Sequence, residues 1–255
     1  MKLHISGLEA CYSKYRALKG VSLDVSPGEV VSLVGPNGSG KSTLIKCIAG
    51  IMRPSSGTIT LDGKDLSKMD RSEMARLIGY VPQSYDRTFF ATVMEAVLLG
   101  RKPHIKWGVS QNDLEIVQRV LEEMNIGDLS GKQLDEISGG ERQRVLIARV
   151  LAQEPGLFLF DEPTNNLDLK YQIEMLDVAR NRARETGASV IISLHDLNLA
   201  LNHTDRTIIM KKGEIFADGK PTDVLTQDNI REVYEVEAHI LESVHGRYIA
   251  PLRVA

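Results

Sequence analysis

The stretch of sequence that decides the fold runs Gly35-Pro36-Asn37-Gly38-Ser39-Gly40-Lys41-Ser42. It fits the pattern G-x-x-x-x-G-K-[ST], and it follows an apolar run, Val30 to Val34, and precedes a helical segment, Thr43 to Ala49. The backbone N–H groups of such a turn and the positive end of the helix form a cradle for phosphate oxygens. We therefore expect a nucleotide site in which Lys41 reaches the outer two phosphates, Thr43 contacts the inner one, and Ser42 coordinates magnesium. A glycine-rich turn without a ligand is the alternative.

Two later apolar runs have the same character as the strand before this phosphate loop. They are Leu157 to Phe160 and Val190 to Ile192, and each follows a helical pattern. Short continuous apolar runs are typical of strands that are buried on both faces, as in a parallel sheet covered by helices. The sequence therefore predicts an α/β fold with a mostly parallel sheet flanked by helices.

The chain departs from this pattern in three places. Alternating apolar residues within 3–8 and 21–25 predict antiparallel strands at the beginning. Between Pro82 and Gln153 the strand signal vanishes, and Thr92 and Ser110 precede helical spacings as caps, which predicts a helical insertion. Beyond residue 205 we expect a hairpin over 207–217, then short helices and a strand-like Tyr248-Ile249.

Composition narrows the class of protein. The 255 residues are 42% hydrophobic and 25% charged with a net charge of −3, which gives no excess of positive charge for binding nucleic acid. We see no apolar run long enough to cross a bilayer and no secretory leader, so we expect a cytosolic location. The two cysteines form no disulfide framework, and the six histidines form no metal-binding pattern.

Two carboxylates end the buried run Leu157 to Phe160. Asp161 can hold magnesium through water, and Glu162 can polarise an attacking water molecule. Two acids at a solvated strand end, without a catalytic role, are the alternative.

Residues 137–144, which we call the signature segment, read Ile-Ser-Gly-Gly-Glu-Arg-Gln-Arg. Ser138 is placed to cap a helix, and Gly139 and Gly140 expose backbone N–H groups, so this is a second helix start that can bind an anion. The segment resembles the signature motif of ATP-binding cassette (ABC) ATPases. The family commonly has Gln where this sequence has Glu141, a departure that we do not expect to remove activity.

The resemblance covers nearly the whole chain and implies roles for further residues. Gln83 resembles the Q-loop glutamine that contacts magnesium and water, Asp168 lies in a segment similar to the D-loop, and His195 resembles the switch histidine at the γ-phosphate. Tyr12 is our candidate for the ring that stacks on adenine, and Tyr15 is close enough to compete. Taken alone, His195 at a strand end would be a structural histidine.

The resemblance also implies an architecture. It divides a single domain, 1–255, into a RecA-like P-loop NTPase core with an antiparallel β subdomain, about 1–83 and 156–255, and a helical subdomain, about 84–155. Each ATP, with Mg²⁺, would lie between Lys41 of one subunit and the signature segment of a second copy, so the working unit would be a head-to-tail homodimer. Asp168 would cross to the opposite subunit.

Partners and cargo follow from the same resemblance. A transporter ATPase of this kind would sit on the cytoplasmic face of the membrane with two transmembrane permease subunits, supplied by an extracytoplasmic substrate-binding protein. The segments 101–104, 164–168 and 195–200 resemble those of importers of iron-siderophore, haem and cobalamin. Tyr85, Phe89 and Phe90 are candidates for the groove that receives a permease helix, with an apolar core cluster as the alternative. A second interpretation is a soluble cassette similar to that of iron-sulfur cluster assembly.

Overall fold

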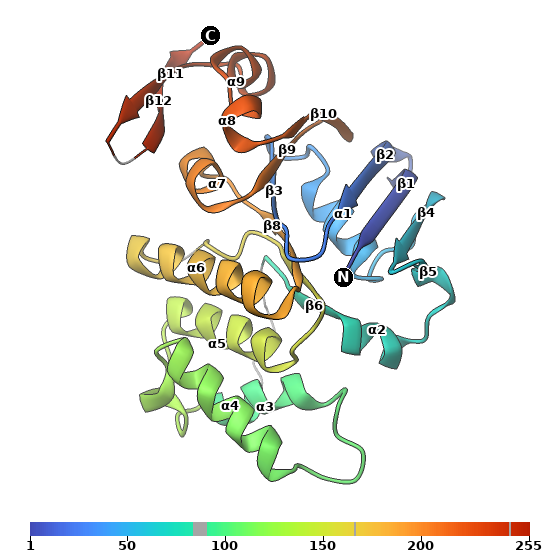
Figure 1. The fold of residues 1–255 in the computed structure, drawn as a ribbon, viewed down its shortest axis with the longest axis vertical. Helices are drawn as coiled ribbons and strands as arrows, with labels where there is room; N and C mark the ends of the chain where they lie inside the picture. Colours follow the sequence, from blue (N-terminus) through green and yellow to red (C-terminus); the bar gives the residue numbers. More distant parts are fainter. Residues whose placement is uncertain (84–90, 166, 245) are drawn as a thin grey trace.

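The computed structural model describes residues 1–83, 91–165, 167–244 and 246–255. At its centre lies a six-stranded sheet with the order β10-β9-β3-β8-β7-β6 (Figure 1). The strands are β3 (Val30–Val34), β6 (Ile78–Val81), β7 (Leu157–Phe160), β8 (Ser189–Ser193), β9 (Arg206–Lys211) and β10 (Glu214–Gly219). Neighbouring strands are parallel except for β10, which pairs antiparallel with β9 at the edge. The α/β fold with a mostly parallel sheet is confirmed.

Both faces of this sheet are buried, which explains why its strands are apolar throughout. Along β3, Val30 and Val34 belong to one core cluster, whereas Val31 and Leu33 belong to another. Helices α5 (Gly139–Ala152), α6 (Leu169–Thr186) and α7 (Leu197–His203) contribute to the first cluster. Helix α1 (Lys41–Ile48) and the antiparallel sheet contribute to the second. The strand ends that carry polar residues are therefore held by packing on both sides.

The antiparallel sheet lies beside α1 and has the order β2-β1-β4-β5 (Figure 1). Its strands are β1 (Leu3–Tyr12), β2 (Tyr15–Val25), β4 (Ser56–Leu61) and β5 (Lys64–Asp65). The expected antiparallel beginning is confirmed, with Leu3 opposite Val25. Strand β4 was not predicted from the sequence, because only its last residues bury alternate side chains. A 3-10 turn, η1 (Leu66–Lys68), and α2 (Arg71–Leu77) then lead to β6.

Between β6 and β7, the described residues form helices joined by loops. They are α3 (Val93–Leu98), η2 (Leu99–Arg101), α4 (Gln111–Glu123), η3 (Gly127–Leu129) and α5. Thr92 and Ser110 cap α3 and α4 as expected, and each shares a reciprocal capping box with an acidic residue three positions later. The bounds of about 84–155 for a helical subdomain stay a prediction, since the first of them falls outside the described residues.

The chain ends in two short helices and a hairpin. Helices α8 (Pro221–Val224) and α9 (Gln227–Tyr234) follow β10, and β11 (Val236–Ser243) pairs antiparallel with β12 (Gly246–Val254). The sequence predicted only the strand-like Tyr248-Ile249 within β12. The rest was missed because most side chains of this hairpin are exposed and give no regular apolar alternation.

Candidate active site

The phosphate loop leads from β3 into α1 through backbone conformations that require glycine. Gly35, Gly38 and Gly40 have φ values of 144°, 76° and 108°, and Gly40 is the N-cap residue of α1. A Cβ atom on Gly35 would lie 2.2 Å from the carbonyl oxygen of Met210, and one on Gly40 would lie 2.8 Å from that of Ala17. All three glycines are therefore favoured by backbone conformation, and Gly35 and Gly40 are also needed for space.

This loop borders a cavity of about 390 Å³. The residues that line the cavity come from the phosphate loop, the start of the chain and the ends of β6 and β7: Tyr12, Tyr15, Ala17, Asn37, Gly38, Ser39, Gly40, Lys41, Ser42, Thr43, Gln83 and Glu162. The expected phosphate-binding residues of α1 thus share a cavity with two of the expected catalytic residues.

Both candidate aromatic rings face this cavity. Tyr12 is 47% exposed and Tyr15 is 59% exposed, so either ring has a free face for stacking. The Tyr15 hydroxyl donates to the Gly38 carbonyl at 3.4 Å. The preference for Tyr12 stays a prediction.

Lys41 is buried beneath the phosphate loop. Its ammonium group donates to the carbonyl oxygens of Gly35 at 2.6 Å and Pro36 at 3.3 Å. Burial lowers the pKa of Lys41, and the nearby carboxylates of Glu162 and Asp161 oppose this shift. An anion in the cavity would favour the charged ammonium.

Asp161 lies at the end of β7 with hydroxyl groups on two sides. Ser42 Oγ donates to Asp161 Oδ1 at 2.8 Å, and Ser193 Oγ donates to the same oxygen at 3.1 Å. Burial raises the pKa of Asp161, which the two hydrogen bonds oppose. The second oxygen, Oδ2, is buried and has no hydrogen-bond partner among the residues that the structure describes. A free carboxylate oxygen beside a serine hydroxyl is the hard oxygen donor set that Mg²⁺ prefers, so these residues fit that ion.

Glu162 is 5% exposed and holds a strained backbone, with φ of +52°. Its backbone N–H donates to Ser193 Oγ at 2.8 Å, which fixes the turn after β7. Three side chains from separate segments converge on its carboxylate: His195 Nε2 lies 2.6 Å from Oε1, and Gln83 Nε2 and Asn165 Nδ2 donate to Oε2 at 2.5 Å and 2.8 Å. The structure therefore gathers Gln83 and His195 around the expected general base.

Ser193 and Asn165 were given no catalytic role from the sequence. Ser193 ends β8, whose three middle residues are apolar, and it bonds to both Asp161 and Glu162. A hydroxyl at the carboxyl end of a buried parallel strand, beside the phosphate loop, was the available signal. Asn165 follows Glu162 by three residues. This spacing is typical of a turn and does not by itself predict a hydrogen bond between the two side chains.

None of the described residues that line this cavity belongs to the signature segment. Ser138 is the exposed N-cap residue of α5, and its hydroxyl donates to the Glu141 carboxylate at 2.7 Å while accepting from the Glu141 N–H at 3.3 Å. The hydrogen bonds from the backbone and hydroxyl of Ser138 hold the pKa of Glu141 below its usual range. Gly139 has open space around its Cβ direction. Asp168 precedes α6 and is exposed, and its side chain makes no cap hydrogen bond within the described part of the chain.

Within the described ranges, no helix combines the length and the apolar content required to span a bilayer. Tyr85, Phe89 and Phe90, the expected permease contacts, and Asn166 of the D-loop-like segment lie outside the described residues.

Comparison with known proteins places the chain in a family. Residues 18–165 match the family model described as ABC transporter. The chain is 46% identical over 246 residues to an uncharacterised ABC transporter ATP-binding protein of Methanocaldococcus jannaschii, with 96% of each chain covered. It is 35% identical to the petrobactin import ATP-binding protein of Bacillus anthracis (96% of this chain, 90% of that protein). It is 38% identical to a hemin import ATP-binding protein of Bradyrhizobium diazoefficiens (92% and 89%).

Solved structures agree with this match. A metal-chelate type ABC transporter in an inward-facing conformation has a TM-score of 0.83 at 26% identity, with 99% of this chain and 97% of that chain covered. A dimeric ATP-binding cassette bound to ADP and phosphate has a TM-score of 0.79 at 29% identity, with 86% and 98% covered.

Proposed function

Because the chain belongs to the ABC transporter family as an ATP-binding, ATP-hydrolysing subunit, we propose that it energises the import of a metal chelate of the siderophore, haem or cobalamin type. The observation that carries the cargo class is the agreement among relatives: petrobactin, hemin and cobalamin import proteins all align over more than nine-tenths of this chain. The resemblance of segments 101–104, 164–168 and 195–200 to such importers supports the same cargo.

In the proposed site, ATP occupies the 390 Å³ cavity with its phosphates on the N–H groups of the phosphate loop. Lys41 exchanges its contacts with the Gly35 and Pro36 carbonyls for the outer phosphates, and its charge then has an anionic partner. Thr43 contacts the inner phosphate. Tyr12 stacks on adenine, with Tyr15 as the competing ring.

Mg²⁺, when bound, neutralises charge on the outer phosphates, and Ser42, Asp161 and Gln83 are the residues that would hold it. The unpartnered Oδ2 of Asp161 supports this assignment. Hydrogen bonds from Ser42, which lines the cavity, and from Ser193 hold the Asp161 carboxylate through Oδ1.

Glu162 acts as the general base in this proposal. Its burial and the convergence of His195 and Gln83 support the role, because a base must be held within hydrogen-bond reach of an attacking water. In the free chain these neighbours bond to the carboxylate itself. Bound water and γ-phosphate would give His195 and Gln83 other partners and leave Glu162 free to accept a proton.

The site is completed by a second copy of the chain. Ser138 and Gly139 are exposed, Gly140 and Glu141 are partly exposed, and none of the four lines the cavity, which supports a head-to-tail homodimer in which they meet the partner's ATP. The exposed Asp168 would contact the opposite subunit. Hydrolysis would remove the phosphate that both halves contact, and the loss of those contacts would open the dimer.

The remaining partners are two transmembrane permease subunits and an extracytoplasmic substrate-binding protein, with the ATPase on the cytoplasmic face of the membrane.

The test is uptake in proteoliposomes that contain the chain with its permease. We expect ATP-dependent uptake of a ferric siderophore, haem or cobalamin, and Glu162→Gln should bind ATP but lower turnover by about 10² to 10⁴-fold. Glu185→Gln removes an exposed carboxylate on α6 and is the matched control. Undiminished turnover in Glu162→Gln refutes the general base. Fractionation away from the membrane, with no permease bound, refutes the transporter role in favour of a soluble assembly ATPase.

A further inference from the structure

The loop between η2 and α4 exposes the one tryptophan of the chain to solvent. Residues 102–109, which we call the 102–109 loop, connect η2 to α4 and project away from the central sheet (Figure 1). Trp107 is 101% exposed and Val109 is 48% exposed. An indole in this position adds no buried apolar area to the fold, so any stabilisation from its burial must come from outside the chain.

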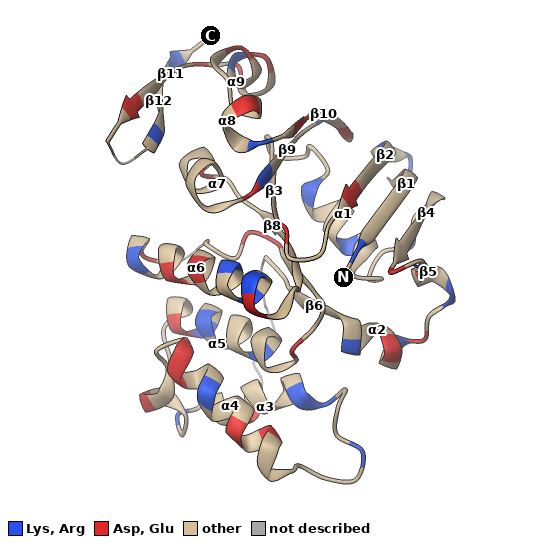
Figure 2. Ribbon diagram, viewed as in Figure 1, with Lys and Arg blue, Asp and Glu red and all other residues tan. Residues whose placement is uncertain are grey.

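The same loop is positively charged. Lys102 and Lys106 are exposed, and the sequence contains no Asp or Glu from residue 99 to residue 112 (Figure 2). The first carboxylate beyond the loop, Asp113, is buried and bound to Arg101, so it does not neutralise the two lysines. The loop therefore offers two cations beside an exposed indole.

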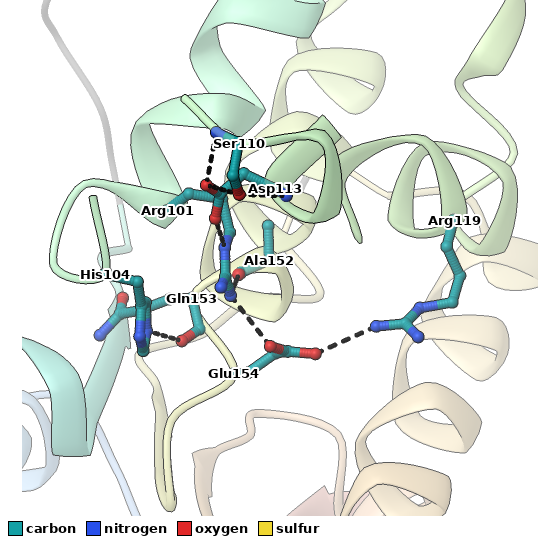
Figure 3. Close-up of polar contacts among 8 residues, drawn as sticks. All are labelled: Arg101, His104, Ser110, Asp113, Arg119, Ala152, Gln153 and Glu154. Atoms are coloured by element: carbon teal, nitrogen blue, oxygen red, sulfur yellow. Dashed lines mark hydrogen bonds and ion pairs between the residues drawn. The ribbon is translucent and has the colours of Figure 1, made fainter. Parts of the chain in front are cut away.

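Buried contacts hold both ends of the loop in place (Figure 3). Before it, Arg101 donates to Asp113 Oδ1 at 2.9 Å and to the Ala152 carbonyl at 2.8 Å. After it, Ser110 donates to Asp113 Oδ2 at 2.6 Å, so one carboxylate links the two ends. His104 Nε2 also lies 2.9 Å from the Gln153 carbonyl. Because folding already orders the loop, little further conformational entropy is lost when its tip binds a partner.

We propose that the 102–109 loop binds the surface of an anionic bilayer, with Trp107 at the headgroup level and Lys102 and Lys106 at lipid phosphates. Tryptophan favours the membrane–water interface because its ring is apolar and its N–H remains in reach of water. Lysines next to it are attracted by anionic headgroups. Protein interfaces instead centre on a cluster of apolar residues that excludes charge, whereas this loop places one exposed indole directly after Lys106 and five residues after Lys102.

The location at a membrane rests on the proposed transporter role, but lipid affinity would be a property of the loop alone. Each lysine near an anionic surface strengthens binding about five-fold, so the two together account for about 25-fold. This interaction is weak and reversible, and it orients a subunit that its permease already holds.

The experiment uses the tryptophan as its own probe, since the chain has no other. The full chain is titrated with vesicles of equal parts phosphatidylcholine and phosphatidylglycerol, and separately with phosphatidylcholine alone, while Trp107 fluorescence is recorded. We expect a blue shift and quenching by brominated lipid with the anionic vesicles only, reduced at about 1 M salt, where the Debye length is about 3 Å.

Variants separate the contributions of the two residue types. Lys102→Glu with Lys106→Glu should abolish binding, whereas Lys68→Glu with Lys220→Glu, the same change in net charge at exposed positions elsewhere, should not. Trp107→Ala, followed by vesicle sedimentation, should weaken binding while ATP binding is unchanged.

Three outcomes would overturn the proposal. The first is an unshifted Trp107 spectrum with anionic vesicles, and the second is an equal loss of vesicle binding in the two lysine double variants. The third is a Trp107 shift that requires the permease and persists in neutral lipid, which would assign the loop to a protein contact. If uptake by the complete transporter proceeds while lipid binding fails, only the lipid contact is refuted.

Discussion

The buried pair Arg101 and Asp113 gives a prediction whose size follows from the geometry. We consider Arg101→Met, Asp113→Asn and the double variant, with Arg119→Met as the matched control. Arg119 and Arg101 both contact Glu154, but the Arg119 side chain is 58% exposed and that of Arg101 is 6% exposed (Figure 3). The comparison therefore isolates the effect of burial on one kind of ion pair.

Removal of one partner from a buried pair commonly costs 3–5 kcal/mol, because the other charge is left without compensation. Here each remaining group keeps partners: Asp113 retains the N–H and hydroxyl of Ser110, and Arg101 retains Glu154 and the Ala152 carbonyl. We therefore expect each single variant to lose about 3 kcal/mol, at the lower end of that range. The double variant should lose about 4 kcal/mol, which corresponds to a coupling of about 2 kcal/mol.

Urea unfolding of the full chain, followed by circular dichroism, measures these free energies. Arg119→Met should lose less than about 1 kcal/mol, as exposed pairs do. Strict additivity of the two single variants, or a loss for Arg119→Met equal to that for Arg101→Met, would refute the account of this cluster.

Three further predictions follow from the same structure. The Ser110 hydrogen bonds and then Arg101 lower the pKa of Asp113 from 3.8 to about 2, so its stabilisation is complete above pH 4; the advantage of wild type over Asp113→Asn in urea titrations should shrink as pH falls from 4 towards 2. Gly35→Ala should abolish ATP binding measured by calorimetry, since its Cβ would meet a backbone oxygen at 2.2 Å. Gly38→Ala, whose Cβ would have no described atom within 4 Å, should lose only about 1 kcal/mol of ATP-binding free energy, and equal effects of the two variants would contradict this account of the loop. Glu141→Gln should keep the α5 cap and strengthen ATP-dependent dimerisation in sedimentation by about 1 kcal/mol, because it removes a negative charge near the proposed phosphate of the partner site; weaker dimerisation would count against that placement.

Much of the core could be predicted from sequence because burial on both faces leaves a local trace. Val30–Val34, Leu157–Phe160 and Val190–Ile192 are continuous apolar runs, and each lies in a central strand. The C-terminal hairpin has no such trace, since its pairing depends on a partner strand and its side chains are mostly exposed. Exposed strands are specified by pairing partners rather than by a pattern in their own residues.

The candidate site likewise has one part that the sequence predicts and one part that only the folded structure reveals. The phosphate loop was predictable because its glycines and Lys41 lie close together in the sequence, and the positive φ values of its glycines are a local requirement of the chain. The convergence of His195, Gln83 and Asn165 on Glu162 joins segments up to 79 residues from that carboxylate, so only the folded sheet brings them together. The family resemblance named two of these three residues without giving their common contact.

Helix α5 connects the signature segment at its start with the buried cluster around Arg101 at its end. It begins after Ser138 and ends at Ala152, where Arg101 contacts its last carbonyl and Gly100 allows η2 to approach so closely that a Cβ would lie 2.0 Å from the Arg149 oxygen. Fourteen residues make a rod of roughly 21 Å. If α5 pivots at Ala152, where Arg101 binds it, a tilt of about 5° moves Ser138 at the other end by roughly 2 Å, enough to make or break a hydrogen bond. A displacement of η2, just before the 102–109 loop, would thus move Ser138, which the proposed dimer places at the partner's nucleotide.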